Sequence, residues 1–342
     1  MSMKTVTRRS FVKAGAAAAA GLAASGRAAD ARKGLLWGAL LHMGTNMWSD
    51  VPVTSWGPFK GEQLKLVCQS DRLRFDEAVW QTLTSRMQAA GMNLVVIDLG
   101  EALQYQSHPE LAVNGSWAVE RFRKELARLR ALGLEPIPKL NFSTAHDTWL
   151  KEYGRQVSTP LYYQVCGDLV REVCAIFDQP RFFHLGYDEE TAGHQAKYSY
   201  AVVRQGELWW HDFLFFVKAV ESQGVRPWIW SDYHWNHPEE FLNRMPKSVL
   251  QSNWYYGASF EPEKVKHVKT YLDLDKAGFD QMPTGSNWSS DVNFKGTVDF
   301  CRANLAPDRL KGFLMAPWFF TLPEWQEKNL QALAQVEAAM RG

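Results

Sequence analysis

Residues 90–98 read Ala-Gly-Met-Asn-Leu-Val-Val-Ile-Asp, and this order of residues decides the fold. The glycine supplies the left-handed cap that ends a helix, and the apolar, β-branched run that follows is typical of a buried strand. The same order recurs at 132–139, 223–230, 277–282 and 311–316. Each repeat predicts that a helix ends and a strand begins after a short link.

Three further apolar runs, at 35–42, 181–186 and 249–254, bring the number of expected strands to eight. Helical periodicity predicts helices between the strands, at 75–90, 119–132, 160–177, 207–223, 262–276 and 323–341. Strand and helix units in one unbroken series are typical of an α/β fold of the (β/α)8 or TIM barrel type. We therefore expect residues 32–342 to form a single barrel without a second domain.

The segments expected to follow the strands are long, for example 45–74, 141–159 and 187–206, whereas the links from helix to strand have one to four residues. In such barrels the segments after the strands gather at the carboxyl end and carry the functional residues. We therefore expect the site among these long segments.

Residues 1–31 form a targeting segment rather than part of the fold. Arg8 and Arg9 precede a weakly apolar, alanine-rich run at 14–24, and small residues follow near Ala29. This pattern predicts a twin-arginine export signal, with the export machinery as a partner and a periplasmic or secreted mature protein. No other apolar stretch approaches the roughly 18 residues of a membrane span, so no integral membrane segment is expected in the mature chain.

The charge and the cysteines exclude several classes of partner and site. Of 38 basic and 37 acidic residues, five basic and one acidic residue lie within residues 1–30, which leaves 33 basic against 36 acidic residues. Nucleic acid is therefore not an expected partner, because no basic surplus remains to neutralise phosphates. Four cysteines are too few for a disulfide scaffold, and the sequence has no Cys-x-x-Cys or His-Glu-x-x-His pattern. Neither a metal nor a cofactor is expected.

The strongest candidate for chemistry follows the fourth expected strand. Residues 181–190 read Arg-Phe-Phe-His-Leu-Gly-Tyr-Asp-Glu-Glu, so that a short apolar strand runs into three acids. Burial raises the pKa of one carboxyl while hydrogen bonds keep another ionised, so Asp188 and Glu189 are expected to divide into a proton donor and an anion. On an extended backbone these two neighbours would point in opposite directions. We take them as the catalytic candidates.

Three neighbouring residues have more ordinary interpretations. His184 lies within the expected strand and is interpreted as a hydrogen-bonded core histidine. Glu190 is interpreted as a solvated loop acid or a helix cap, and His194 as a surface or helix position.

The ends of the other strands carry indoles and hydrogen-bonding groups. The chain has 15 tryptophans, and indole rings stack well on the flat C–H faces of sugars. Apolar walls with a few converging polar groups are typical of a ligand pocket, and here they favour a carbohydrate. The expected substrate-binding residues are Asp98, Asn141, His146, Tyr187, Trp230, Asp232, Trp254, Trp288 and Trp318.

Two motifs point to a known family. The run from His184 to Glu189 resembles the strand-four motif His-(Ile/Leu)-Gly-Gly-Asp-Glu of glycoside hydrolase family 20, the β-N-acetylhexosaminidases. Residues 137–146 are similar to that family's strand-three segment, with His146 in the place of its histidine. Trp254 and Trp318 fall where the family places tryptophans of its sugar pocket. The resemblance covers the barrel from about residue 35 to the end.

The resemblance implies a retaining hydrolysis in which the substrate's own 2-acetamido oxygen attacks the anomeric carbon. Glu189 would protonate the leaving oxygen and later activate water, and Asp188 would orient the acetamido nitrogen. The implied substrate is a glycan with a β-linked N-acetylhexosamine. Adjacent carboxylates suit this chemistry, because they cannot flank a glycosidic bond as an ordinary retaining pair does at about 5 Å.

The sequence departs from the family pattern at several positions. The family's strand-one arginine has no counterpart near 42–48, its strand-seven tyrosine is not evident in 282–291, and Tyr187 replaces the second glycine of the strand-four motif. An ordinary two-carboxylate glycosidase acting on a 2-hydroxy sugar therefore stays open. Asp98, Glu101 or Asp232 would then supply the nucleophile or base.

Two further alternatives come from other functional classes. A non-catalytic carbohydrate-binding barrel would keep the tryptophans and tolerate the loss of Glu189. A metal-dependent hydrolase would use His42, His184 and Asp188, although a complete ligand set is not apparent in the sequence.

Overall fold

The computed structural model describes residues 34–342, so the predicted export signal lies outside the described residues. Residues Leu36–Gly342 form one compact unit. Within the part of the chain that the structure describes, no helix is long and apolar enough to cross a membrane.

Eight parallel strands form the barrel, and the sequence-based prediction of a (β/α)8 fold is confirmed. Their order in the sheet is β6-β5-β4-β3-β2-β1-β8-β7. The ring closes between β6 and β7 through parallel bridges from Gln251 to Gln281 and from Trp254 to Thr284. The strands are β1 (Leu36–His42), β2 (Leu94–Asp98), β3 (Glu135–Lys139), β4 (Phe182–His184), β5 (Arg226–Trp230), β6 (Leu250–Ser252), β7 (Thr284–Gly285) and β8 (Gly312–Met315).

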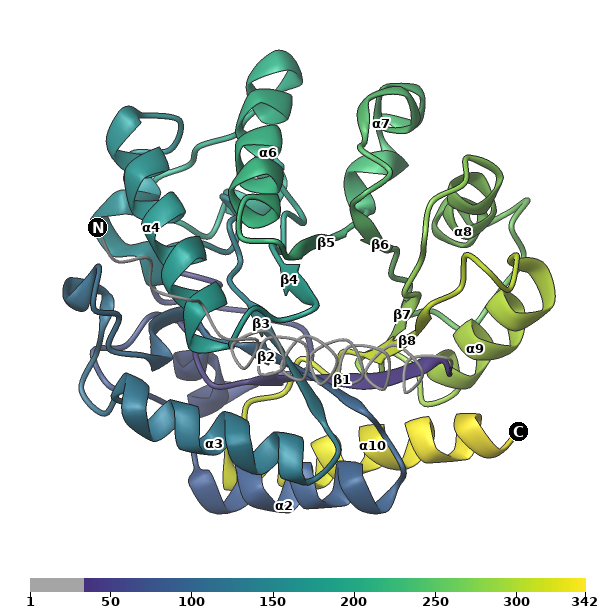
Figure 1. Ribbon diagram of the computed structural model, residues 1–342, viewed down its shortest axis with the longest axis horizontal. Coiled ribbons are helices and arrows are strands. Elements are labelled where there is room, and N and C mark those ends of the chain that lie inside the picture. Colours follow the sequence, from purple (N-terminus) through teal and green to yellow (C-terminus); the bar gives the residue numbers. More distant parts are fainter. Residues whose placement is uncertain (1–33) are drawn as a thin grey trace, which may run out of the picture. The chain divides into compact units, whose positions relative to one another are not determined.

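Helices surround the strands on the outside, as Figure 1 shows for α2, α3 and α10 along one side and α4, α6, α7, α8 and α9 along the rest. The helices are α2 (Glu77–Ala89), α3 (Val119–Ala131), α4 (Pro160–Ile176), α5 (Ala192–Gln195), α6 (Gly206–Glu221), α7 (Pro238–Arg244), α8 (Lys266–Lys276), α9 (Asn293–Asn304) and α10 (Gln326–Arg341). Short 3-10 helices occupy Gly61–Leu66, Gly100–Ala102, Pro109–Leu111, Thr148–Arg155, Asp232–Trp235 and Pro323–Trp325.

The barrel interior is a packed hydrophobic core rather than a channel. It joins residues from every strand or its flank, including Leu40, Val96, Ile137, Trp228 and Leu314. Trp254 and Trp318 are only partly buried and pack against this core from its carboxyl end. The core therefore lies directly beneath the carboxyl end of the barrel, where the functional site of such folds is found.

Two parts of the fold differ from the sequence-based prediction. The expected strand at 277–282 lies just before β7, because Pro283 has no N–H to donate to a ladder and only Thr284 and Gly285 pair as a strand. Helices α7 and α9 have no counterpart among the helices named from periodicity, since α7 is short and Gly296 with flanking Asn and Thr residues weakens the helical pattern of α9. Its buried face, which includes Phe294, Val298 and Cys301, still packs well enough to form it.

Four links from helix to strand are longer than the expected one to four residues, at 177–181, 245–249, 277–283 and 305–311. The long segments after β1, β3 and β4 are confirmed, and the last of them contains α5. All four cysteines, Cys68, Cys166, Cys174 and Cys301, are free in the structure.

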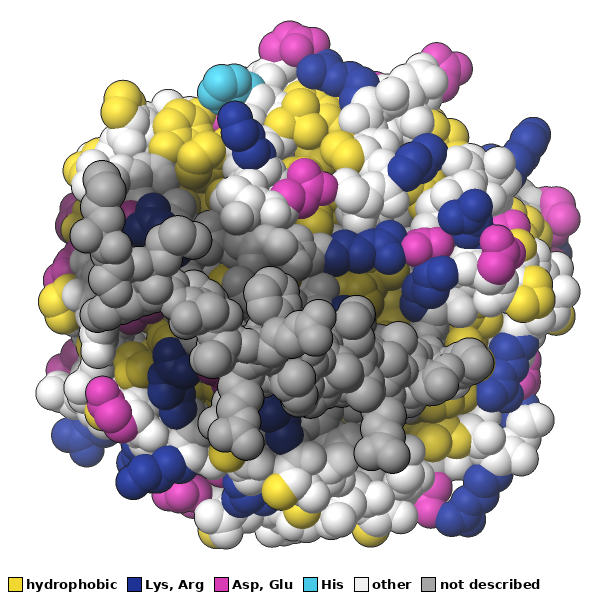
Figure 2. All heavy atoms as spheres, viewed as in Figure 1, with side chains coloured by type: hydrophobic (Ala, Val, Ile, Leu, Met, Phe, Trp, Pro, Cys, Tyr) yellow, Lys and Arg dark blue, Asp and Glu magenta, His cyan; other side chains and the backbone are white. Residues whose placement is uncertain are grey.

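Basic and acidic side chains are mixed on the face of the molecule that Figure 2 shows outside its grey atoms. Ion pairs on α8 and α9, Lys269 with Asp273 and Lys295 with Asp299, likewise place opposite charges side by side. This part of the surface therefore presents no extended field of a single sign.

Candidate active site

A cavity of about 980 Å³ opens among the segments that follow the strands. Its polar residues include Asn141, His146, Asp188 and Glu189, which come from the ends of β3 and β4. Tryptophan and tyrosine side chains make up much of its wall, and they are Trp48, Trp56, Tyr198, Trp254, Tyr255, Tyr256, Trp288 and Trp318. A volume of this size suits one or a few sugar rings, since ligand clefts range over roughly 300–1,000 Å³.

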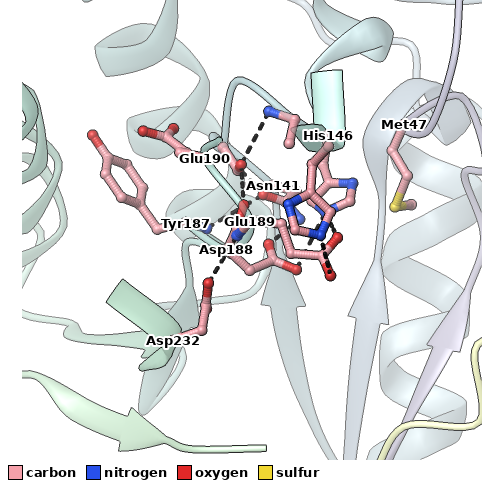
Figure 3. Close-up of polar contacts among 12 residues, drawn as sticks. Met47, Asn141, His146, Tyr187, Asp188, Glu189, Glu190 and Asp232 are labelled. Atoms are coloured by element: carbon pink, nitrogen blue, oxygen red, sulfur yellow. Dashed lines mark hydrogen bonds and ion pairs between the residues drawn. The ribbon is translucent and has the colours of Figure 1, made fainter. Parts of the chain in front are cut away.

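Asp188 and Glu189 converge on one histidine. His146 Nε2 lies 3.3 Å from Asp188 Oδ2 and 3.3 Å from Glu189 Oε2, and Figure 3 shows the three side chains facing one another. The expectation that the two acids would point in opposite directions is wrong, because the backbone after β4 is not extended. Gly186, Tyr187 and Glu189 have φ values of 70°, 73° and 59°, and these left-handed turns bring both carboxylates to the same side.

Asn141 holds this turn in place. Its Nδ2 donates to Asp188 Oδ1 at 3.0 Å, and its Oδ1 accepts from the backbone N–H of Tyr187 at 3.3 Å. Gly186 is required at the closest approach, because a Cβ there would lie 2.1 Å from Asn141 Oδ1. Gly186, the first glycine of the strand-four motif, therefore lets the side-chain amide of Asn141 reach Asp188.

Electrostatic pairing sets the protonation of this group. Burial disfavours the charged form of His146, but the carboxylates of Asp188 and Glu189 outweigh it and raise its pKa to about 10. Burial would likewise raise the pKa of Glu189, but hydrogen bonds from His146 and His194 lower it below its ordinary value. In the free protein the proton of this site therefore resides on His146 rather than on Glu189.

Beside the acid pair, Asp232 is a carboxyl whose pKa is raised. It lies directly behind the strand-four pair, where its Oδ2 accepts from the backbone N–H of Glu189 at 2.9 Å and its Oδ1 accepts from Trp254 Nε1 at 3.5 Å. Burial and the nearby charges of Asp188 and Glu189 raise its pKa to about 7. A proton donor and an anion are therefore present side by side as Asp232 and Glu189.

The pairing of His146 makes the stability of the fold depend on pH. The pKa of His146 is 6.5 unperturbed and about 10 in the folded chain, so its stabilisation is complete below pH 6.5 and is lost as the pH rises through 10. Between pH 7 and pH 9 the free energy of unfolding should therefore fall by up to about 1.4 kcal/mol per pH unit. Urea unfolding of the parent and of His146→Gln over this range is the measurement. Equal pH slopes for the two proteins would contradict the predicted pKa.

Glu190 belongs to a buried ion network and is not the solvated acid that the sequence suggested. Arg204 has no exposed side-chain area and contacts Glu190, which is 3% exposed, and Asp212, which is fully buried. Arg204 also donates to the carbonyl of Phe142 at 2.8 Å, and Glu190 Oε1 accepts from the backbone N–H of Thr144 at 2.8 Å. This network ties the segments after β3 and β4 to α6, and so holds His146 against the acid pair.

Replacing the cation of this network should destabilise the fold strongly. Arg204→Met leaves Glu190 and Asp212 buried without their partner, which costs about 3–5 kcal/mol in comparable cases. Arg171→Met is the matched control, because the Arg171 side chain is 63% exposed and an exposed pair such as that with Asp168 is worth less than about 1 kcal/mol. Denaturant unfolding should separate the two variants clearly. A loss below about 1 kcal/mol for Arg204→Met would show that the network does not support the site.

The cavity lining does not include four of the predicted substrate-binding residues, and three of them lie away from the cavity. Tyr187 points away from the acid pair in Figure 3 and packs against Trp209 and Phe213 of α6, because its left-handed backbone turns the side chain outward. Trp230 is 1% exposed and belongs to the barrel core. Asp98 is 1% exposed and pairs with Lys139 Nζ at 2.6 Å inside the barrel.

Other predicted residues come together as expected. Asn141, His146, Asp188, Glu189, Trp254, Trp288 and Trp318 all line the cavity. Asp232 lies directly behind it. His184 is the hydrogen-bonded core histidine that was predicted, since its Nδ1 accepts from the backbone N–H of Gly186 at 3.0 Å.

Glu101 has a structural role instead of a catalytic one. Its buried carboxylate accepts from the backbone N–H groups of Thr45 at 2.8 Å and Asn46 at 3.2 Å, and so it holds the segment after β1. Burial outweighs these hydrogen bonds and raises its pKa to about 7. Of the three alternative carboxylates suggested by the sequence, only Asp232 is beside the acid pair.

Sequence reasoning missed several residues of the cavity. Tyr256 stacks on Trp254, and its hydroxyl accepts from Trp318 Nε1 at 2.8 Å. His194 lies in helix α5 and is partly exposed, as its interpretation as a surface or helix position predicted, but it also lines the cavity, with Nε2 3.3 Å from Glu189 Oε1. The aromatic run 254–256 was a signal for Tyr256, whereas no local pattern marked His194.

The described residues contain one trio of possible metal ligands within 4.8 Å of one another, namely His146, Asp188 and Glu189. His42, which the metal-dependent alternative needed, instead faces Asp98 with Nδ1 3.4 Å from Oδ2. The ligand set of that alternative is therefore not assembled.

No family model matches the sequence, and no curated protein matches it. Solved structures do match its fold. A chitobiase of Flavobacterium johnsoniae is 17% identical with a TM-score of 0.56 over 78% of this chain and 48% of its own. A β-N-acetylhexosaminidase of Bacteroides fragilis is 11% identical with a TM-score of 0.59 over 88% of this chain and 65% of its own. An enzyme of glycoside hydrolase family 138 that targets pectin rhamnogalacturonan II is 12% identical with a TM-score of 0.53 over 88% of this chain and 39% of its own.

The likeness establishes the barrel fold. The chain spans about half to two thirds of the length of the first two of these structures. At identities of 11–17% the likeness extends to the path of the backbone, and function has to be argued from the site.

Proposed function

We propose that this protein is an exported glycoside hydrolase that removes β-linked N-acetylhexosamine, or a related sugar, from glycans by a retaining, substrate-assisted mechanism. The observation that carries this proposal is the convergence of Asp188 and Glu189 on His146 in an aromatic-walled cavity. Export by the twin-arginine route, to the periplasm or beyond, is supported by the sequence of residues 1–31. The solved barrels named chitobiase and hexosaminidase add support at the level of the fold.

The spacing of the two acids favours a nucleophile supplied by the substrate. Their ligand atoms and that of His146 lie within 4.8 Å of one another, which leaves no room for the water of an inverting pair, whose carboxyls are about 6.5–9.5 Å apart. Both acids also reach the cavity from the end of a single strand, so they do not face each other across a sugar ring. One acid and one orienting carboxylate are what a 2-acetamido nucleophile requires.

In the proposed reaction the acetamido oxygen bonds to the anomeric carbon while the glycosidic C–O bond breaks, and Glu189 gives its proton to the leaving oxygen. Glu189 must first receive that proton, and His146 Nε2, 3.3 Å from Glu189 Oε2, is its source. A bound sugar covers the 27% of the Glu189 side chain that is exposed, and burial favours the neutral carboxyl. In the second step Glu189 takes a proton from water, which opens the cyclic intermediate with net retention.

Asp232 supports a second candidate function. With its pKa raised to about 7 it carries a proton near neutral pH, and it lies against the strand-four turn through its bond to the backbone of Glu189. A two-carboxylate glycosidase on a 2-hydroxy sugar would use Asp232 as the acid and Glu189 as the nucleophile. The similar barrel that targets a pectin component shows that the fold also occurs in an enzyme outside family 20.

Aryl glycosides with and without a 2-acetamido group test the proposal. We expect turnover of 2-acetamido β-glycosides to exceed that of the matched 2-hydroxy glycosides by about a hundredfold or more, because the latter lack the nucleophile. The measurement is kcat/KM for each matched pair. Comparable values of kcat/KM would favour the two-carboxylate glycosidase that uses Asp232. If no aryl glycoside is turned over although sugars still bind, the protein would instead be a non-catalytic carbohydrate-binding barrel.

A further inference from the structure

Lys197 is a cation in the wall of the cavity that holds the acid pair. Its ammonium lies 3.4 Å from the centre of the Trp56 indole, which lines the same cavity. Within residues 34–342 no ion pair joins Lys197 to a carboxylate, and its side chain is only partly buried. A cation held on an aromatic face beside a cavity, without a counter-ion of its own, is suited to bind an anionic ligand.

The backbone around Lys197 is fixed by contacts with the segment after β1. The carbonyl of Lys197 accepts from Ser49 Oγ at 3.1 Å, and the hydroxyl of Tyr198 donates to the carbonyl of Met47 at 2.7 Å. Tyr198 also separates this cavity from a second one of about 760 Å³. Lys197 is therefore held at the cavity wall by both of its neighbouring segments.

Lys197 lies at the mouth of the cavity. Its aromatic partner Trp56 belongs to residues 51–57, all of which line the cavity and are partly or fully exposed. The acid pair lies deeper, since Asp188 is 5% exposed. When a glycan is cut at Glu189, the units beyond the cleaved bond have to extend toward this mouth. Lys197 therefore lies on the leaving side of the bond.

The charges of the lining leave Lys197 available to a ligand. The carboxylates of Asp188 and Glu189 are balanced first by His146, whose pKa they raise to about 10. A hydrogen bond to Glu189 also raises the pKa of His194, so a second imidazole offsets the acid pair. Once Glu189 carries the proton that it gives to the leaving oxygen, its charge no longer reaches Lys197, and an anion on the substrate can take its place.

We propose that Lys197 binds a negatively charged group, a carboxylate or a sulfate ester, on the sugar unit at the leaving side of the bond that Glu189 cleaves. This inference rests on the proposed hydrolysis. It specifies the substrate as a glycan in which the β-linked N-acetylhexosamine is attached to an acidic sugar. The ammonium donates to the anion, and the Trp56 indole keeps the ammonium in place from its other side.

Calorimetric titration of the full chain with three thio-linked disaccharides tests this site, because the sulfur linkage resists hydrolysis. In each disaccharide N-acetylglucosamine is β-linked to a second unit, which is glucuronate, glucose 6-sulfate or glucose. The parent should bind at least one of the two anionic disaccharides about tenfold more tightly than the neutral one. The tighter of the two identifies the charged group as a carboxylate or a sulfate.

Two variants of Lys197 separate its charge from its packing. Lys197→Met keeps a long side chain on the indole but removes the charge, so it should abolish the preference for the anionic disaccharides. Lys197→Arg keeps the charge and should retain most of the preference. Lys247→Met is the matched control, because the Lys247 ammonium also lies over a ring, 3.2 Å from the centre of Phe279, but does not line this cavity. It should bind all three ligands as the parent does.

Equal affinities of the parent for the three disaccharides would overturn the inference and leave the proposed hydrolysis standing. An equal loss for all three in Lys197→Met would do the same, since it would show that Lys197 only supports the cavity wall. A preference that depends on Lys197, in a protein that turns over no aryl glycoside, would overturn the hydrolysis and retain the anion site. If none of the three disaccharides binds, both proposals fail.

Discussion

Glu189→Gln should lower kcat on a 2-acetamido aryl glycoside by about 10²–10⁴-fold while the dissociation constant for the sugar changes little. The amide keeps the size of the side chain and still accepts hydrogen bonds from His146 and His194, both of which are 3.3 Å from the present carboxylate. It cannot give a proton to the leaving oxygen or take one from water. Steady-state kinetics and calorimetry of the same variant measure the two quantities separately.

The control for this experiment is Glu221→Gln, which removes an exposed acid from the far end of α6 and should retain full activity. A substrate with a highly activated leaving group needs less protonation, so it should recover part of the rate of Glu189→Gln in the first step. Parental activity of Glu189→Gln on unactivated substrates would exclude Glu189 as the acid and would direct attention to Asp232, whose pKa is raised to about 7.

Asp188→Asn should lower kcat by roughly a hundredfold or more on 2-acetamido substrates, with KM nearly unchanged. The acetamido nitrogen gains positive charge as the ring closes, so a carboxylate beside it stabilises the transition state more than the ground state. Asn keeps the volume and can still contact Asn141, which now donates to Asp188 Oδ1 at 3.0 Å. The measurement is kcat and KM of the parent and of the variant on a 2-acetamido glycoside and on the matched 2-hydroxy glycoside.

A cyclic thiazoline that mimics the intermediate provides the independent check. It should inhibit the parent strongly and Asp188→Asn weakly, because the variant lacks the charge that the intermediate requires. Cleavage of 2-hydroxy glycosides as readily as 2-acetamido ones, together with indifference to the thiazoline, would rule out the substrate-assisted route.

The strand ends could be located from the sequence, but the direction of the side chains at those ends could not. Asn141, His146 and the acid pair were found because each follows a strand, and the carboxyl ends of parallel strands meet at one place. Tyr187 and Trp230 also follow or end strands, yet one turns outward to α6 and the other remains in the core. Position along the chain predicts which end of the barrel a residue occupies, but the side chain's direction depends on backbone dihedral angles and neighbours.

The barrel, the location of the site at its carboxyl end and the candidates Asp188 and Glu189 could all be predicted from the sequence, because glycine caps, strand periodicity and strand ends are local features. The folded chain was needed to show that both acids meet at His146, that Glu190 is buried against Arg204, and that a second cavity lies behind Tyr198. These features depend on left-handed turns and on contacts between segments far apart in the chain. Charge pairing and burial, and therefore pKa, are properties of such contacts and leave no local pattern in the sequence.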